Sequence, residues 1–181
     1  MSRSDDLKML SMLRERKTRD DGFRLLMNTY KEKIYWYIRR LVISHEDAED
    51  ILQETFINVY RYVGSFKGES HIYTWLYRIA TNECIRHFKR VNKQLQKVEM
   101  DEKMMNSFET NDTENEEAIL VKFQKALLQL PEKQRIVFNM RYYDELSYKE
   151  MGEILNSSEN ALKTNYHYAT EKIKAYLKEN E

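Results

Sequence analysis

The stretch SHEDAEDILQETFINVYRYVGSFKGESHIYTWLYRIATNECIRHFKR, residues 44–90, decides how this chain folds. Ser44 followed by Asp47 fits a capping box, in which a hydroxyl and a side chain three residues on satisfy free amide groups at a helix start. Apolar residues then recur every three or four positions, which predicts one buried stripe on a helix. Gly64 and Gly68 interrupt this pattern, so two helices around a short loop are expected.

Polar and aromatic side chains give the two predicted helices different characters. On the first helix Asp47, Asp50 and Glu54 recur at spacings of three and four residues, which places them on one face with Gln53 beside them. The second helix is aromatic at its start and basic at its end. Its three early rings lie on consecutive faces, so at least one of them is expected to present an aromatic surface of the kind on which a base stacks. The rings belong to Tyr73, Trp75 and Tyr77.

Few residues of the chain break helices. One proline and four glycines occur in 181 residues, so a mostly helical protein is expected. Two further helices precede the opening stretch, over about Asp5–Lys17 and Asp20–Val42. Together the four helices predict an N-terminal domain over residues 1–91. The longer of the two early helices carries one apolar stripe, which consists of Phe23, Met27, Tyr30, Ile34, Ile38 and Leu41.

Charge is unevenly distributed along the chain, although the net charge is zero. Residues 1–98 hold 19 Lys and Arg against 13 Asp and Glu, whereas residues 99–117 hold one Lys and 8 acids. The segment NSFETNDTENEE, residues 106–117, has Phe108 as its single apolar residue and is expected to be disordered. A flexible acidic linker is therefore predicted over residues 92–117, with an extended reach of about 85 Å. It is either an inert tether or a spacer that lets the two domains sit on separate stretches of DNA.

A C-terminal domain is predicted over residues 118–181. An apolar helix ends at Pro131 and a second helix follows it. Ser147 and Glu150 then form another capping box, which opens a short helix. The turn Asn-Ser-Ser at residues 156–158, where Asn tolerates left-handed backbone angles, leads into a longer last helix. A short helix, a three-residue turn and a longer helix make a helix-turn-helix.

Catalytic and metal-binding patterns do not occur in the sequence. No nucleophile has a paired base and no glycine loop could cradle a phosphate, so neither enzymatic activity nor a cofactor is expected. Cys84 and His87 stand three residues apart but lack the further ligands that a metal site requires. The single cysteine cannot form an internal disulfide, and no apolar run approaches the roughly 18 residues that span a bilayer. We expect a cytoplasmic protein without membrane insertion.

Three long segments resemble the sigma-70 family of bacterial transcription initiation factors. DAEDILQETF (Asp47–Phe56) and TWLYRIATNECIRHFKR (Thr74–Arg90) resemble region two of that family. LPEKQRIVFNMRYYDELSYKEMGEIL (Leu130–Leu155) resembles the opening of region four. No separate region-three domain is visible between them, and this reduced layout is similar to that of the extracytoplasmic-function (ECF) subgroup. The resemblance implies an all-α fold of two helical domains, a four-helix region 2 domain and a helix-turn-helix region 4 domain.

The same resemblance implies a function and partners. Sigma factors of this subgroup bind core RNA polymerase, recognise the minus-ten and minus-thirty-five promoter elements, and start transcription by helping to open the DNA. The expected partners are therefore core RNA polymerase, promoter DNA and an anti-sigma factor. The acidic helix face would bind the polymerase core through Asp47, Asp50 and Gln53.

The resemblance further implies which residues contact DNA. At the minus-ten element, a loop and Asn82 would hold an unpaired base, rings would separate or stack bases, and basic residues would hold phosphates. These residues are Phe66, Lys67, His71, Trp75, Tyr77, Arg78, Asn82, Arg86, Lys89 and Arg90. The minus-thirty-five residues, on the last helix, are Asn160, Lys163, Thr164, Asn165, His167 and Tyr168. This helix departs from the family pattern, because many members place several arginines where it offers Lys163, and the phosphate contribution is smaller as a result.

Two other classes of protein remain open on the sequence alone. A conventional helix-turn-helix regulator with a ligand-sensing N-terminal domain would bind specific duplex DNA without polymerase. A helical interaction protein without a DNA role would agree with the nearly neutral C-terminal domain, where 10 basic residues face 9 acids. For Asn82, the alternative to holding an unpaired base is that its side chain is a polar group that faces water.

Overall fold

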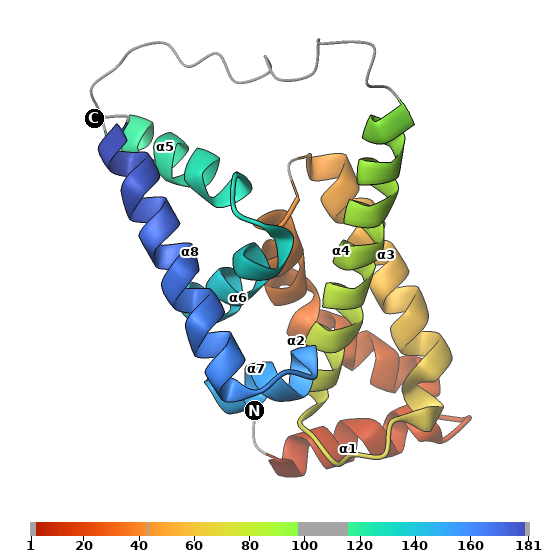
Figure 1. Ribbon diagram of the computed structural model, residues 1–181. Helices are drawn as coiled ribbons and strands as arrows, with labels where there is room; N and C mark the ends of the chain where they lie inside the picture. The colour runs from red at the N-terminus through yellow and green to blue at the C-terminus, as the bar shows by residue number, and fades with distance from the viewer. Residues whose placement is uncertain (1–2, 43, 98–115, 180–181) are drawn as a thin grey trace.

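The computed structural model of the protein describes residues 3–42, 44–97 and 116–179 (Figure 1). Within these ranges the chain forms eight α-helices and one short 3-10 helix, and no strand, which confirms the all-α prediction. The bounds are α1 Arg3–Arg14, α2 Arg19–Arg39, α3 His45–Tyr62, η1 Val63–Ser65, α4 Ile72–Lys97, α5 Glu116–Leu128, α6 Glu132–Tyr142, α7 Tyr148–Leu155 and α8 Glu159–Glu179.

The predicted linker is only partly covered by the structure. Residues 98–115, which make up most of it, lie outside the described residues. Helix α4 continues to Lys97, beyond the end of the predicted N-terminal domain. Residues 92–97, the first part of the predicted linker, are therefore the last residues of α4.

Local sequence signals determine where the helices begin and end. The hydroxyl of Ser44 accepts a hydrogen bond from the Asp47 amide at 2.9 Å, and Ser147 and Glu150 form a complete capping box at the start of α7. Asn156 ends α7 in the left-handed region, with φ of 48°. The capping box at Ser147 and the left-handed turn at Asn156 are confirmed, whereas at Ser44 only one half of the predicted box forms, because the Asp47 carboxylate accepts from the Ser44 hydroxyl instead.

Helix α2 packs against α1, α3 and α4 and so forms the middle of the N-terminal unit. Its fully buried side includes Leu26 and Tyr37, which the predicted stripe omits. Phe23 and Met27, which the stripe includes, are only partly buried. The buried face of α2 is therefore rotated from the predicted one, and these two side chains lie at a groove instead.

The N-terminal and C-terminal units pack against each other through α6 and α7, which lie beside α2 and α4 (Figure 1). Val137, Met140 and Met151 of the C-terminal unit belong to the same buried cluster as the core of the N-terminal unit. Gly152 permits the tight packing of α7 on its following turn, because a Cβ there would lie 2.9 Å from the Ser157 carbonyl oxygen.

A buried ion pair joins the two units. The Arg40 guanidinium donates to the Asp144 carboxylate at 2.7 Å, and it also lies 4.7 Å from the centre of the Tyr143 ring. The Asp144 side chain is only 5% exposed and that of Arg40 is 20% exposed. Burial raises the pKa of the Asp144 carboxyl, although Arg40 opposes the rise. Removing either partner would leave a largely desolvated charge behind, so the loss of one partner would disfavour the packed arrangement.

No helix in the described ranges is both long and apolar enough to cross a membrane.

Candidate functional site

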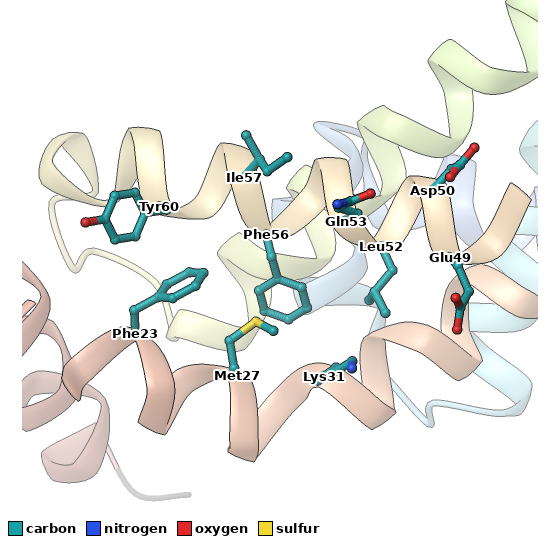
Figure 2. A pocket seen from close by; sticks show the side chains of 10 residues that line it. All are labelled: Phe23, Met27, Lys31, Glu49, Asp50, Leu52, Gln53, Phe56, Ile57 and Tyr60. Carbon is teal, nitrogen blue, oxygen red and sulfur yellow. The ribbon is translucent and has the colours of Figure 1, made fainter. Parts of the chain in front are cut away.

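A groove of about 590 Å³ runs between α2 and α3 on the outside of the N-terminal unit (Figure 2). Its lining residues are Phe23, Met27, Lys31, Glu49, Asp50, Leu52, Gln53, Phe56, Ile57 and Tyr60. One end is aromatic: the Phe23 ring lies edge-on to Phe56 at 6.3 Å and to Tyr60 at 5.1 Å. The other end is charged, with the acidic Glu49 and Asp50 on α3 and the basic Lys31 on α2. The groove could therefore accept a segment that carries both apolar and basic side chains.

The acidic face predicted for α3 is divided by the structure. Asp50 and Gln53 are exposed and line the groove, whereas Asp47 does not line it. The Asp47 carboxylate accepts from the Ser44 hydroxyl at 2.8 Å and lies 3.8 Å from the His87 ring on α4. As the third residue of α3, Asp47 takes part in starting the helix, and this local role turns its carboxylate away from the groove.

His87 is buried between α3 and α4. Burial lowers the pKa of its imidazole, Asp47 and Asp50 oppose this shift, and Arg90 adds to it. Because the pKa lies below its ordinary value of about 6.5, the ring is neutral near pH 7.

Sequence reasoning missed the apolar half of the groove. The sequence pattern places Phe23 and Met27 on the buried stripe of α2, whereas both side chains are only partly buried. Ile57 and Tyr60 carry a usable signal, because they lie off the apolar stripe of α3 and are 41% and 39% exposed. Large apolar side chains off the buried stripe of an amphipathic helix indicate a second contact face.

Two of the predicted minus-ten rings, those of Tyr77 and Phe66, are buried and are not available at the surface in this structure. Tyr77 is fully buried and packs on Tyr37 of α2, with ring centres 4.8 Å apart. Phe66 is 7% exposed and stacks on Trp75 at 4.9 Å. The physical reason is that α2 covers the side of α4 that carries Tyr77, whereas the Phe66 ring closes the core beneath its loop. Trp75 remains partly exposed.

A row of polar residues follows the exposed side of α4. Arg78, Asn82, Arg86 and Arg90 recur every four residues and are all exposed, as is Lys89. This spacing keeps them on one face of the helix. The Arg86 guanidinium also donates to the Glu83 carboxylate of its own helix at 2.7 Å. The structure therefore brings the predicted basic residues and Asn82 together.

The beginning of this row is covered by α7. Arg78 donates to the backbone carbonyl of Glu153, and the Tyr73 hydroxyl donates to the Glu150 carboxylate. In this arrangement the first turns of α4 contact the C-terminal unit, although the Arg78 side chain remains exposed.

Loop residues between η1 and α4 are held close to α1. Lys67 is exposed, whereas the His71 ring donates through Nδ1 to the Asp6 carboxylate at 2.9 Å. Gly68 has φ of +80°, a conformation that favours glycine.

Helix α8 presents most of its predicted residues on one exposed face. Lys163, Thr164, His167 and Tyr168 are exposed, at the spacing of one helix face, and Asn160 is exposed one turn before. Asn165 is partly buried, and its side-chain amide donates to the Ala161 carbonyl of the same helix at 2.7 Å. Asn165 is thus the least available of the six.

Comparisons with known proteins identify the class of this chain. The family model for sigma-70 region 2 matches residues 26–94, and the model for sigma-70 region 4 matches residues 120–173. The chain belongs to the sigma-70 family.

Relatives narrow the class to the ECF subgroup. The chain is 34% identical to the ECF RNA polymerase sigma factor SigW of Bacillus subtilis (strain 168), over 88% of this chain and 90% of that protein. It is 30% identical to the ECF RNA polymerase sigma-E factor of Escherichia coli (strain K12), with 84% of each chain covered. The protein is an ECF sigma factor that acts in transcription initiation.

Two solved structures share its fold. CnrH in complex with the cytosolic domain of CnrY aligns with a TM-score of 0.72 at 18% identity, over 97% of this chain and 99% of that chain. The sigma factor RpoE in complex with the anti-sigma factor NepR from Bartonella quintana aligns with a TM-score of 0.71 at 21% identity, over 86% of this chain and 96% of that chain.

Proposed function

We propose that the groove between α2 and α3 binds core RNA polymerase. The observation that carries this proposal is the combination of an apolar floor with the exposed Asp50 and Gln53 at one rim of a single groove. A helix with basic and apolar residues on one side would satisfy both parts. Asp47 contributes by holding the start of α3, and not through direct contact.

The exposed row of α4 is the proposed minus-ten surface. Arg78, Arg86, Lys89 and Arg90 hold backbone phosphates, and Asn82 bonds a base edge, since its amide can both donate and accept. Lys67 and His71 contribute from the loop, and the exposed part of Trp75 offers a stacking face. Because Arg78 is bonded to Glu153 in the packed arrangement, α7 must move away before Arg78 can contact DNA.

Helix α8 is the proposed minus-thirty-five reader. Lys163 supplies a charged donor, and His167, Thr164 and Tyr168 supply polar and apolar contacts in the major groove. Few phosphates are neutralised by this helix, so we expect weak and modestly salt-dependent duplex binding by the free protein. This expectation separates a sigma factor from a conventional helix-turn-helix regulator.

An anti-sigma factor is the proposed regulatory partner, since both structural neighbours were solved in complexes, that of RpoE with the anti-sigma factor NepR and that of CnrH with the cytosolic domain of CnrY. We further propose that the protein acts in the cytoplasm, that it has no enzymatic activity of its own, and that residues 1–91, 92–117 and 118–181 are the region 2 domain, the linker and the region 4 domain.

A charge reversal in the groove tests the polymerase surface. Asp50→Lys should lower affinity for core polymerase about tenfold or more, because the attraction between Asp50 and a basic residue of the polymerase would become a repulsion. Folding should survive, since Asp50 is exposed. Glu54→Lys is the matched control, with the same reversal on an exposed residue of α3 that does not line this groove. Equal affinities of the two variants for core enzyme would remove the groove from the interface.

A further inference from the structure

Helix α1 is not used by any of the surfaces proposed above, yet one of its faces follows the loop between η1 and α4. In Figure 1 this loop runs alongside α1. Asp6, Leu10 and Arg14 are spaced by four residues, so they project from the same side of the helix. Each of the three contacts a different point of the loop.

The contacts lie at the start, the bend and the end of the loop. Arg14 donates to the backbone carbonyl of Phe66. Leu10 packs under Gly68, with its Cδ1 atom 3.6 Å from the point where a Cβ would stand. The Asp6 carboxylate accepts from His71 Nδ1 at 2.9 Å.

Asp6 also holds the start of α4. It accepts from the Ile72 amide at 3.3 Å, and its side chain is only 5% exposed. The first amides of a helix have no partner within the helix, and a carboxylate near them is favoured by the helix dipole. His71 precedes the helix, and no Ser, Thr, Asp or Asn stands in its place to cap it. The carboxylate from α1 therefore supplies a cap that the local sequence does not.

We propose that α1 positions the 66–71 loop for minus-ten recognition, with Asp6 and Arg14 as positioning residues. This inference rests on the proposed role of the loop in holding an unpaired base. Arg14 fixes the Phe66 backbone, and the Phe66 ring in turn supports Trp75. Asp6 fixes the ring of His71, and both anchors leave Lys67 exposed between them. A loop that is ordered before it meets DNA avoids the entropy loss of ordering on binding.

The test uses the full chain bound to core polymerase. Three variants probe the anchors: Asp6→Ala removes the hydrogen bonds to His71 and to the Ile72 amide, Asp6→Asn keeps an acceptor oxygen of similar shape, and Arg14→Ala removes the bond to Phe66. Glu15→Ala and Arg16→Ala are matched controls, since each removes the same charge from an exposed residue close by in the chain. Open-complex yield is measured on promoters in which each minus-ten base is replaced in turn, together with affinity for core polymerase.

The expected result is a loss of open complex on the order of tenfold for Asp6→Ala and Arg14→Ala, as when one or two loop residues must be ordered on binding. Discrimination should weaken at the base that the loop holds and persist at the others. Core affinity should not change, Asp6→Asn should recover part of the loss, and both controls should behave as the parent protein. Arg14 is exposed, so Arg14→Ala keeps the test valid even if Asp6→Ala does not fold.

Two outcomes would overturn the inference, and a third separates it from the proposal on which it rests. An equal loss at every promoter variant with unchanged base discrimination would mean that α1 only stabilises the fold. Normal opening and discrimination by both alanine variants would show that the loop needs no anchor. A double variant of the loop itself, Lys67→Ala with His71→Ala, serves as the reference. If this variant leaves base discrimination unchanged, the loop does not read the promoter, and the proposed function of the loop is wrong whatever the α1 variants show.

Discussion

The two sides of the N-terminal unit differ in what covers them. The groove between α2 and α3 is open, with exposed Asp50 and Gln53 at its rim. The beginning of the polar row on α4 is closed by α7, through hydrogen bonds to Glu150 and Glu153. The same domain thus presents its proposed polymerase surface freely while part of its proposed DNA surface is held by the C-terminal unit.

This difference suggests an order of events. Among the described residues, the side-chain hydrogen bonds between the two units start from Arg40 at the end of α2 and from α4 residues, all outside the groove, so the proposed polymerase surface is accessible in the packed arrangement. Contact between promoter DNA and Arg78 requires the units to separate first. Binding of the polymerase and separation of the units would then be linked, since polymerase would favour whichever arrangement it binds more tightly.

Loss of the buried ion pair between Arg40 and Asp144 should have the largest effect on how far the C-terminal unit covers α4. Asp144→Ala leaves the Arg40 guanidinium largely buried without its carboxylate, which should weaken packing of the units by about 2 kcal/mol, or roughly thirtyfold. The radius of gyration of the free protein, measured by small-angle X-ray scattering, should increase. Affinity for core polymerase through the open groove should not decrease.

Two controls isolate the buried pair. Asp21→Ala breaks an exposed pair with Arg24, whose side chains are 66% and 75% exposed, and should leave the radius unchanged. Arg40→Met combined with Asp144→Leu removes both charges and should restore packing. A folded Asp144→Ala protein with the parent radius would show that the ion pair does not hold the units together.

Asn82→Ala should have the next largest effect, and it acts on the α4 row beyond the part that α7 covers. Loss of a base-edge hydrogen bond should reduce open-complex yield about tenfold, since such contacts contribute about 1–3 kcal/mol. Permanganate footprinting of unpaired thymines would measure it. A template already mismatched across the minus-ten region should recover part of the loss, because pairing no longer has to be broken. Normal opening on fully paired DNA would mean that Asn82 simply faces water.

Features that depend on nearby residues were predictable from the sequence. Ser44 and Ser147 begin helices because their hydroxyls reach amides three residues on, and Asn156 ends one because its own backbone tolerates φ of 48°. The order of helices and the exposed row with Asn82 and Arg86 follow from the same kind of local regularity.

Features that depend on distant residues were not predictable. Tyr77 is buried because Tyr37, on another helix, packs against it. The pairing of Arg40 with Asp144 joins residues more than a hundred positions apart, and Arg40 looks in the sequence like an ordinary cation at a helix end. Helical periodicity predicts which face of a helix is buried. It does not predict which distant residues pack against that face.

Tyr73→Phe should weaken the packing of α7 on α4, but by less than Asp144→Ala does. It keeps the ring and removes the hydroxyl that donates to Glu150, a loss of about 1 kcal/mol. Burial acts to raise the pKa of Glu150, but hydrogen bonds from Ser147 and Tyr73 lower it overall. The variant should therefore show a higher Glu150 pKa by NMR titration and a slight increase in radius. Tyr142→Phe, at a residue that is 54% exposed, is the control, and an unchanged Glu150 pKa in Tyr73→Phe would argue against the bond.

The smallest effect is expected from His87, on the side of α4 that faces α3 and not α7. Burial lowers the pKa of His87, with Arg90 adding to the shift and Asp47 and Asp50 opposing it. The unfolded chain therefore binds a proton more readily, so stability is full above about pH 6.5 and is lost as the pH falls below that value. The decrease in melting temperature between pH 7.5 and 5.5 should be smaller in His87→Gln than in the parent protein. His45→Gln, at a side chain that is 64% exposed, should keep the parent slope.

If the two sides of α4 are independent, His87→Gln should change the slope equally in the Asp144→Ala background, since the effects of distant sites add. A larger change there would mean that the packing of the C-terminal unit reaches His87, and the division between an open and a covered side would no longer hold.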